Sequence, residues 1–434
     1  MTPTGDLPHA SRRTFLRRAG LTAAAGAMLP LVESPSDFAL ASTADPDQLF
    51  KAGRFGEAER GYRRLLRGEP RNARALAQLG YIALLANRFG PAETYLSKAV
   101  ALTPGDVTSR QRLAECFVRQ DRLTPAIPLL QSTNRPRDTA FAEVYSHISG
   151  VPWQVYGARG TRVPFWSLDP IPSVKASVNG GEPKTFLLDT YATLDLTQDA
   201  AEEAGLRAVA SYSGGVVDGH PVTLYLGVLD SFKVGDIEIR NIPVQWNDAQ
   251  RPPLPGGPPA GAFGTTIFYH FLTTMDYAGR ALILRRKTRG RRRGSQAQGR
   301  LPLWLAGDHF PCTLGSLGDH GPRMVTVDTG GIGSALDTTV EIAERVGIEV
   351  DYEHPMERFG RTSYPITADR ISLGRAVGRN VRGVAAKDVF PGLPGPGQSA
   401  QFGFDLIANF THEFFKPFAI TFDYTDMKLS VTRR

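Results

Sequence analysis

The sequence predicts a chain of two architectures, a stack of short α-helices followed by a mainly β region built from two related lobes. Near the N-terminus, one phrase recurs at a spacing of 34 residues. Farther along, runs rich in β-branched and aromatic residues dominate and are bounded by Gly, Pro, Asn or Asp. Within them, FLLDTYA (186–192) is followed 139 positions later by VTVDTGG (325–331). A constant offset shared by several landmarks indicates an internal duplication.

The composition suits ordinary globular domains. The chain has 434 residues, enough for two or three domains, with 41% hydrophobic and 9% aromatic residues. The formal net charge of +7 reflects residues 285–300, which hold eight Lys or Arg and no acid. No aromatic residue interleaves with these arginines, so we interpret the run as a solvated linker and expect no nucleic-acid partner. A weak contact with an anionic membrane surface stays open.

Cysteine and histidine usage predicts no metal site. Cys116 and Cys312 fall in different predicted domains, so the sequence encodes no disulfide framework and no zinc site. His220, His320 and His412 lack metal-ligand spacing with one another. We therefore expect no cofactor and no bound metal.

The N-terminal stretch resembles a twin-arginine export signal. Arg12 and Arg13 are followed by a Phe-Leu pair, by a weakly apolar stretch (19–32), and by a small-residue cleavage pattern at 39–41. The resemblance implies a signal over residues 1–41 and a periplasmic or extracellular protein. The apolar stretch is short for a membrane span, and an uncleaved anchor stays open as an alternative.

Residues 44–146 are expected to form helical repeats. The recurring phrase occupies 54–58, 88–92 and 122–126, and Pro70 and Pro104 keep the same step. Small residues let two antiparallel helices approach, and a proline ends the second helix of a pair. The pattern resembles tetratricopeptide repeats. The resemblance implies a concave groove for a peptide or protein partner; a structural appendage that orients the β region is the alternative.

The β region is expected to divide into lobe 1 (160–284), a basic linker (285–300) and lobe 2 (301–434). Both lobes end in a similar segment that contains Asp-Tyr, at 276–277 and at 423–424. The landmarks related by an offset of 139 are Asp189 and Asp328, Gly235 and Gly374, 240–242 and 379–381, and 263–264 and 402–403.

These motifs resemble the aspartic proteases, more closely the bacterial retropepsin-like proteins than the pepsins. The resemblance implies a two-lobed acid-protease fold in which each lobe brings an Asp-Thr-Gly loop to a shared cleft. Two carboxylates in one site share a proton, so one can activate water while the other polarises the scissile carbonyl. By this resemblance Asp189 and Asp328 are the catalytic pair. Thr190 and Thr329 would exchange hydrogen bonds beneath them, and Gly330 would let the backbone approach a carboxylate.

Four more glycines take supporting roles by the same resemblance. Gly264 and Gly403 would pack behind the two active-site loops, and the phrase that begins at Gly403 is close to the G-x-D-apolar phrase of the retropepsin-like group. Gly214 and Gly215 mark a candidate flap, because paired glycines permit a mobile hairpin tip. The equivalent flap region of lobe 2 is 359–365.

Tyr191 stands where the family has glycine, and Gly331 replaces the usual alanine. If position 191 requires a positive φ, a tyrosine there costs about 1 kcal/mol or more and displaces Asp189. Two functions therefore stay open. One is an exported aspartic-type endopeptidase that acts on a peptide or protein substrate, with the repeats as an interaction scaffold. The other is a catalytically inactive peptide-binding or adaptor protein. Both lobes lie in one chain, so we expect a monomer.

Overall fold

The structure is a computed structural model that describes residues 44–217, 220–249, 257–287 and 299–433. The expected export signal and most of the basic linker lie outside these residues. Asp45–Arg434 forms one compact unit, with a helical part followed by a mainly β part, as the sequence predicts. Within the described ranges, no helix is long and apolar enough to cross a membrane.

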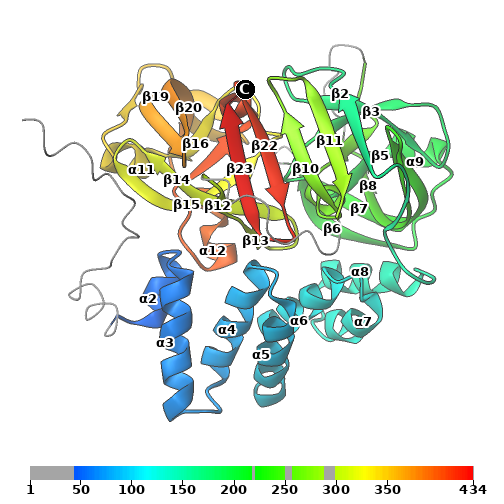
Figure 1. The fold of residues 1–434 in the computed structure, drawn as a ribbon, viewed down its shortest axis with the longest axis horizontal. Helices are drawn as coiled ribbons and strands as arrows, with labels where there is room; N and C mark the ends of the chain where they lie inside the picture. The colour runs from blue at the N-terminus through cyan, green and yellow to red at the C-terminus, as the bar shows by residue number, and fades with distance from the viewer. Residues whose placement is uncertain (1–43, 218–219, 250–256, 288–298, 434) are drawn as a thin grey trace, which may run out of the picture. The chain divides into compact units, whose positions relative to one another are not determined.

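The helical part consists of antiparallel pairs joined by short turns (Figure 1). The helices are α2 (Pro46–Lys51), α3 (Phe55–Gly68), α4 (Ala73–Leu85), α5 (Phe89–Leu102), α6 (Val107–Val118), α7 (Leu123–Gln131) and α8 (Pro136–Ser146).

The turns within the helix pairs repeat at the spacing of 34 residues. Gly53, Asn87 and Asp121 have φ of 73°, 50° and 59°, a conformation that Gly, Asn and Asp adopt more readily than other residues. The pairs also need small residues where their backbones meet. A Cβ atom on Gly80 would lie 2.5 Å from Leu96 Cγ. The repeated phrase therefore corresponds to a repeated helical hairpin.

Lobe 1 contains an eight-stranded sheet in the order β1-β8-β5-β9-β4-β3-β7-β6, with two short helices. Its elements are β1 (Gln154–Gly157), β3 (Ser173–Val178), β4 (Lys184–Leu188), β5 (Leu194–Thr197), α9 (Gln198–Glu203), β6 (Ala210–Val217), β7 (His220–Val234), β8 (Ile237–Asn247), β9 (Gly261–Phe263) and α10 (Thr265–Phe268).

Lobe 2 contains a nine-stranded sheet in the order β13-β14-β15-β21-β16-β20-β19-β17, with β18 paired to β19. Its elements are β13 (Trp304–Ala306), β14 (Phe310–Leu317), β15 (His320–Asp328), β16 (Leu336–Thr339), α11 (Val340–Arg345), β17 (Glu349–Val350), β18 (Met356–Arg358), β19 (Arg361–Leu373), β20 (Ala376–Ala386), η1 (Pro396–Gln398), α12 (Ser399–Phe402), β21 (Ala408–Thr411) and α13 (His412–Phe415).

A six-stranded sheet in the order β12-β23-β22-β10-β11-β2 joins the lobes (Figure 1). The two described ends of the basic run lie in or beside this sheet. Arg285 pairs with Leu272 within the sheet, and Arg300 lies 2.6 Å from Asp423. Its strands are β2 (Gly160–Pro164), β10 (Phe271–Asp276), β11 (Ala281–Arg286), β12 (Leu301–Pro302), β22 (Phe418–Asp423) and β23 (Lys428–Arg433).

The offset of 139 relates the two aspartates, and β8 to β20, whereas β5 and β16 begin 142 residues apart (336 − 194). The turns before these strands carry Gly235 and Gly374 with φ of 57° and 58°, and Asn241 and Asn380 also share positive φ. The next connection is longer in lobe 2, where 387–407 separates the strands, than in lobe 1, where 248–260 does. These eight extra residues belong to a segment that contains η1 and α12, so later elements match at an offset of 147 (418 − 271).

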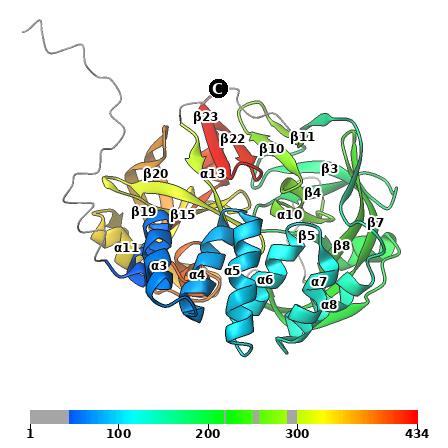
Figure 2. The same cartoon turned by 60° about the horizontal axis from the view of Figure 1, so that its bottom comes forward.

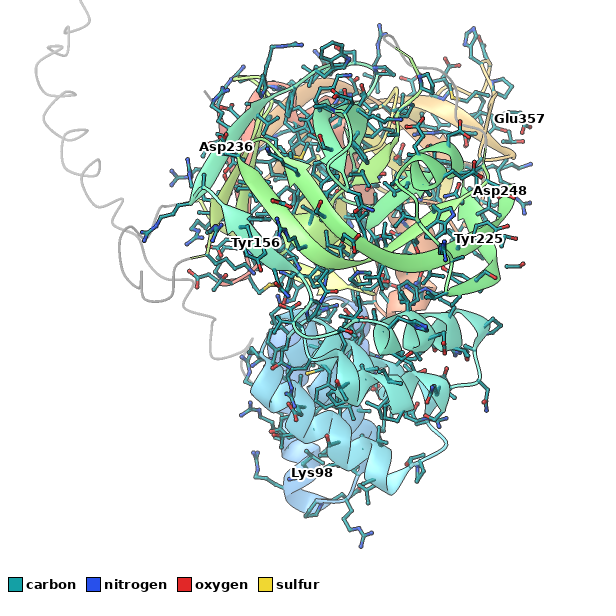
Figure 3. The ribbon with its side chains drawn as sticks, turned by 90° about the vertical axis from the view of Figure 1, so that its right-hand side faces the viewer. Lys98, Tyr156, Tyr225, Asp236, Asp248 and Glu357 are labelled. Atoms are coloured by element: carbon teal, nitrogen blue, oxygen red, sulfur yellow. The ribbon has the colours of Figure 1, made fainter. Side chains whose placement is uncertain are left out.

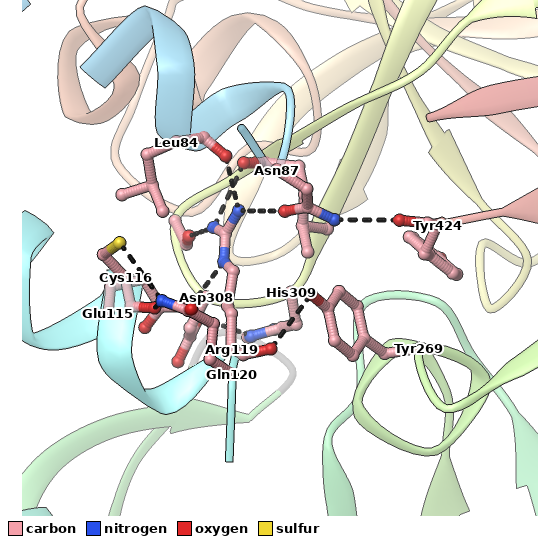
Figure 4. Close-up of polar contacts among 12 residues, drawn as sticks. Leu84, Asn87, Glu115, Cys116, Arg119, Gln120, Tyr269, Asp308, His309 and Tyr424 are labelled. Carbon is pink, nitrogen blue, oxygen red and sulfur yellow. Dashed lines mark hydrogen bonds and ion pairs between the residues drawn. The ribbon is translucent and has the colours of Figure 1, made fainter. Parts of the chain in front are cut away.

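The helical part packs along an edge of both lobes (Figures 1 and 2), whereas Lys98 on α5 lies on its far side (Figure 3). The Phe55 ring centroid lies 5.3 Å from that of Trp304 and 5.1 Å from that of Phe404. Arg119, which is buried, donates hydrogen bonds to the carbonyls of Leu305 and Gly307 (Figure 4). Helices and lobes therefore share one core.

Because of this shared core, helices and lobes should unfold together. Phe404→Ala removes a buried ring from the junction and should lower the free energy of unfolding by about 3–5 kcal/mol. Helical circular dichroism and tryptophan fluorescence, followed through one urea titration, should report coincident transitions. Leu65→Ala, on an exposed side chain of α3, is the control and should change little. Two separate transitions in the wild type would contradict the shared core.

Candidate functional site

The two aspartates follow equivalent strands. Asp189 comes directly after β4, which pairs in parallel with β9, and Asp328 ends β15, which pairs in parallel with β21. These strands are interior strands of their sheets, so each aspartate lies at the end of an interior strand where the two lobes meet.

A reciprocal set of hydrogen bonds ties the two loops together. Thr190 N–H donates to Thr329 Oγ1 (2.9 Å), and Thr329 N–H donates to Thr190 Oγ1 (3.0 Å). Each hydroxyl also donates across the junction, Thr190 to Val327 O (2.7 Å) and Thr329 to Leu188 O (3.1 Å). Both threonines are fully buried. We call this set the threonine clamp; it satisfies buried polar groups of each loop with groups of the other.

Both carboxylates meet at Gly330. Gly330 N–H donates to Asp328 Oδ1 at 2.8 Å. A Cβ atom on Gly330 would lie 2.5 Å from both carboxylate oxygens of Asp189, so a side chain there would collide with that carboxylate. The clamp and this glycine place the two predicted catalytic residues side by side.

The environments of the two carboxylates differ. Asp328 is buried, whereas Asp189 is partly exposed. Burial and the neighbouring Asp189 charge together raise the pKa of Asp328 to about 8, while a hydrogen bond from Asn409 opposes the shift. The pair therefore retains a proton on Asp328 in neutral solution.

Asn409 is a site residue that the sequence analysis missed. Its Nδ2 donates to Asp328 Oδ2 and to Asp337 Oδ2, both at 3.0 Å. Its Oδ1 accepts from the Thr326 hydroxyl at 2.8 Å and lies 3.2 Å from the Tyr191 hydroxyl. Two carboxylates on one side and two hydroxyls on the other fix the orientation of the amide. Asn409 thus holds one oxygen of Asp328.

Asp337 connects this network to the turn of β18 and β19. Arg358 Nη1 donates to Asp337 Oδ1 at 2.6 Å. Lobe 1 lacks the equivalent link to its aspartate. Asp195, the counterpart of Asp337, pairs with Ala262 where Asp337 pairs with Asn409, and it accepts from Gln245 instead. Ala262, at the position of Asn409, has no side-chain amide to offer Asp189.

Tyr191 occupies its position without the backbone strain considered above, because its φ is not positive. Its N–H donates to Asp189 Oδ1 at 2.7 Å. The ring turns toward lobe 2, where it meets Phe310 edge-on at 4.9 Å and its hydroxyl lies 3.0 Å from Gln398 Oε1. Tyr191 thus links the Asp189 loop to lobe 2.

The prediction for Gly403 is wrong, whereas Gly264 lies behind a dyad loop. A Cβ atom on Gly264 would lie 1.7 Å from Asp189 O. Gly403 instead ends α12 in a left-handed conformation and faces Phe50. The residue beside Asp328 is Thr411, and its side chain fills the space that a Cβ on Gly331 would need. The Phe-Gly pair that suggested Gly403 lies in the longer connection of lobe 2.

The candidate flap lies in a hairpin of β6 and β7. Gly214 and Gly215 are in strand β6, at a register shift, rather than at the hairpin tip, and residues 218–219 lie outside the described part of the chain. In lobe 2 the turn between β18 and β19 carries Phe359 and Gly360, both with positive φ.

One group of side chains in the described residues has metal-like spacing, namely Asp169, His412 and Glu413. Sequence spacing among histidines alone did not reveal it. Lys416 Nζ lies 2.5 Å from Asp169 and 2.7 Å from Glu413, so an ammonium group already neutralises the two carboxylates. We assign no metal to this group.

The clamp predicts a sharp difference between two substitutions. Thr190→Val removes the hydroxyl that Thr329 N–H and Val327 O bind, which should cost about 1–3 kcal/mol for each group left unpaired. Thr190→Ser keeps the hydroxyl and should stay close to wild type. Urea unfolding of both variants measures the difference; equal stabilities would contradict the role of the clamp.

The raised pKa of Asp328 predicts a pH dependence of stability. The folded protein keeps this proton up to a pH of about 8, whereas the unfolded chain loses it near the ordinary value of 3.8. The proton on Asp328 therefore contributes fully to stability below a pH of 3.8, and this contribution is lost as pH rises through about 8.

Asp189→Asn removes the charge that helps to raise this pKa. The variant should lose less stability than wild type as pH rises from about 5 to 9. The difference should be about 1.4 kcal/mol for each pKa unit by which the Asp189 charge raises the pKa of Asp328. Unfolding free energies measured across this range test the sign, and parallel pH profiles would argue against a coupled pair.

Comparisons with known proteins agree with the geometry of lobe 1. Residues 174–267, which include the Asp189 loop, match the family model described as aspartyl protease. No curated protein matches the chain. Among solved structures, a mutant O-GlcNAc transferase of Thermobaculum terrenum is 27% identical over 26% of this chain and 22% of that chain, with a TM-score of 0.22. That overlap is too limited to carry an argument. The first lobe is thus similar to the aspartyl protease family.

Proposed function

We propose that this chain is an aspartic-type endopeptidase in which Asp189 and Asp328 activate a water molecule. The observation that carries the proposal is the threonine clamp, which brings both aspartates onto Gly330. The match of lobe 1 to an aspartyl protease model supports the same reaction class.

The proposed reaction uses one proton shared by the pair. Asp189, ionised and the more exposed member, takes a proton from water as its oxygen attacks the peptide carbonyl carbon. Asp328, protonated, donates to the carbonyl oxygen. In the resulting tetrahedral intermediate, the amide nitrogen accepts the proton from Asp189 and the C–N bond breaks, while a hydroxyl of the intermediate returns a proton to Asp328 as the carbonyl reforms. A carboxylic acid and an amine leave, and the pair again holds one proton.

Asn409 would act as a positioning residue in this scheme. Its amide binds Asp328 Oδ2 while Gly330 N–H binds Oδ1, so the carboxyl plane is held from both oxygens. The Asp328 proton is then directed toward the space shared with Asp189. Asp337 and Arg358 hold the amide in turn.

The proposal also covers the N-terminal stretch and the helical part of the chain. Arg12 and Arg13 with the following apolar stretch support export by the twin-arginine route, and a periplasmic or extracellular location. The helical part would be a scaffold of tetratricopeptide type that presents protein or peptide partners to the lobes. Its shared core with the lobes supports an integral role rather than a separate appendage.

Peptide cleavage tests the proposed function. The purified chain, incubated with a peptide library at acidic to neutral pH, should cleave peptides, and Asp189→Asn and Asp328→Asn should each lower the rate by at least about a thousandfold. Mass spectrometry of the products gives the rates and the cleavage sites. Peptide binding without cleavage by the wild type would favour the inactive, peptide-binding alternative.

Asn409→Ala should shift the pH profile of cleavage. The amide stabilises the ionised form of Asp328, so its loss should move the alkaline limb upward by about one pH unit. Gln154→Ala is the control, because Gln154 lies on β1 at the edge of the lobe 1 sheet, where its amide donates to Val151 O. A lower rate with an unchanged profile would reduce Asn409 to a purely structural role.

A further inference from the structure

A cavity of about 760 Å³ lies between the helical part and the lobes. One wall comes from α4, α6 and α8, and the other from β8, α10, α12 and the turn between β13 and β14. Its volume is in the range of ligand-binding sites. We call it the chamber. It reaches the dyad loops, since its lining includes Thr193, near Asp189, and Phe310, whose ring meets that of Tyr191.

Two arginines of the chamber have carboxylate partners within the protein. Arg119 Nε lies 2.7 Å from Glu115 Oε1, and Arg137 forms an ion pair with Asp308 on the lobe side. Figure 4 shows Arg119 and Glu115 on the helical side, with Asp308 facing them. The charges of these arginines are therefore compensated.

Arg112 differs from both. Its guanidinium lies over the Tyr81 ring, 3.6 Å from the centroid, and it lines the chamber. Within the described residues it has no carboxylate in ion-pair distance and no hydrogen-bond acceptor. Burial lowers the pKa of this guanidinium, which nevertheless stays charged. The partner of this guanidinium is thus a ring face rather than a carboxylate, which leaves its N–H groups available to an anionic group of a ligand.

We propose that the chamber binds a carboxylate of the peptide substrate and that Arg112 receives it. This proposal rests on the proposed peptidase function and names a substrate class for it. Arg135, the other chamber arginine without an ion pair in the described residues, donates to Gln111 instead, whereas Arg112 lies on a ring face. A planar guanidinium suits bidentate contact with a carboxylate. A doubly charged phosphate would meet Glu115 and Asp308 in the same space. The carboxylate is either a chain terminus or the side chain of Asp or Glu.

The chamber also offers groups that suit a peptide backbone. Gln111 and Gln245 line opposite walls, where their amides bond to Asp138 and Asp195. Thr266 Oγ1 is buried beside the chamber and has no partner in the described residues, so it can accept a hydrogen bond from a bound peptide or donate one to it.

The experiment uses the full chain carrying Asp328→Asn, so that bound peptides stay intact. Four fluorescent octapeptides of otherwise neutral residues are compared: a free C-terminus, the same peptide amidated, an amidated peptide with one internal Glu, and its Gln equivalent. Dissociation constants come from fluorescence anisotropy. At least one carboxylate peptide should bind ten- to a hundredfold more tightly than its neutral match, and the pair that differs identifies the source of the carboxylate.

Arg112→Met should abolish this preference and leave the affinity for neutral peptides within about twofold. Arg60→Met, on an exposed residue of α3 outside the chamber, removes the same charge and should keep the preference. Arg112→Gln serves as a second variant if the first does not fold, as judged by circular dichroism. Equal binding of all four peptides, or a preference that survives both Arg112 substitutions, overturns the proposal.

The two proposals fail in different ways. Carboxylate-dependent binding through Arg112 without cleavage by the wild type would contradict the peptidase function and leave the chamber site standing. Cleavage by the wild type with no carboxylate preference in binding would support the peptidase function and overturn the chamber site.

Discussion

The site depends on the hydrogen bonds that Thr190 and Thr329 exchange across the junction of the lobes. Each loop satisfies buried N–H and carbonyl groups of the other, so neither aspartate can move away without leaving such groups unpaired. Gly330 then lies where both carboxylates must meet, and any side chain at that position would displace Asp189. Catalytic geometry and stability of the lobe junction are thus set by the same contacts.

Duplication brought the aspartates together, and departures from symmetry gave them different environments. Lobe 2 carries Asn409 where lobe 1 carries Ala262, and the Asn409 amide binds the second oxygen of Asp328. The side chain of Tyr191 crosses to lobe 2, where its hydroxyl meets the same amide. Burial and the Asp189 charge keep a proton on Asp328, whereas the Asn409 amide opposes them by stabilising the ionised form.

Local patterns predicted much of this arrangement. Spacing along the chain indicated the helical hairpins and both aspartate loops, because repeats and strand-turn signals are local. The role predicted for Gly403 was wrong because eight extra residues in lobe 2 change the offset between the lobes before β21. Phe402 and Gly403, at the end of α12, keep the offset of 139 by chance, whereas Thr411 is the residue that pairs with Asp328. Asn409 and Arg112 gave no signal, since their roles arise from partners, or from the lack of one, that only the folded chain defines.

We infer that the clamp creates one carboxylate pair that shares a proton held on Asp328. Carbon-13 NMR of the protein labelled at aspartate carboxyl carbons measures this directly. We predict a resonance with the shift of a protonated carboxyl at pH 6 that titrates near pH 8, disappears in Asp328→Asn, and titrates at lower pH in Asp189→Asn; burial raises the pKa of Asp121 to about 7, and its resonance should be the same in both variants. If the resonance that Asp328→Asn removes titrates below about pH 5, the two residues do not form a coupled pair.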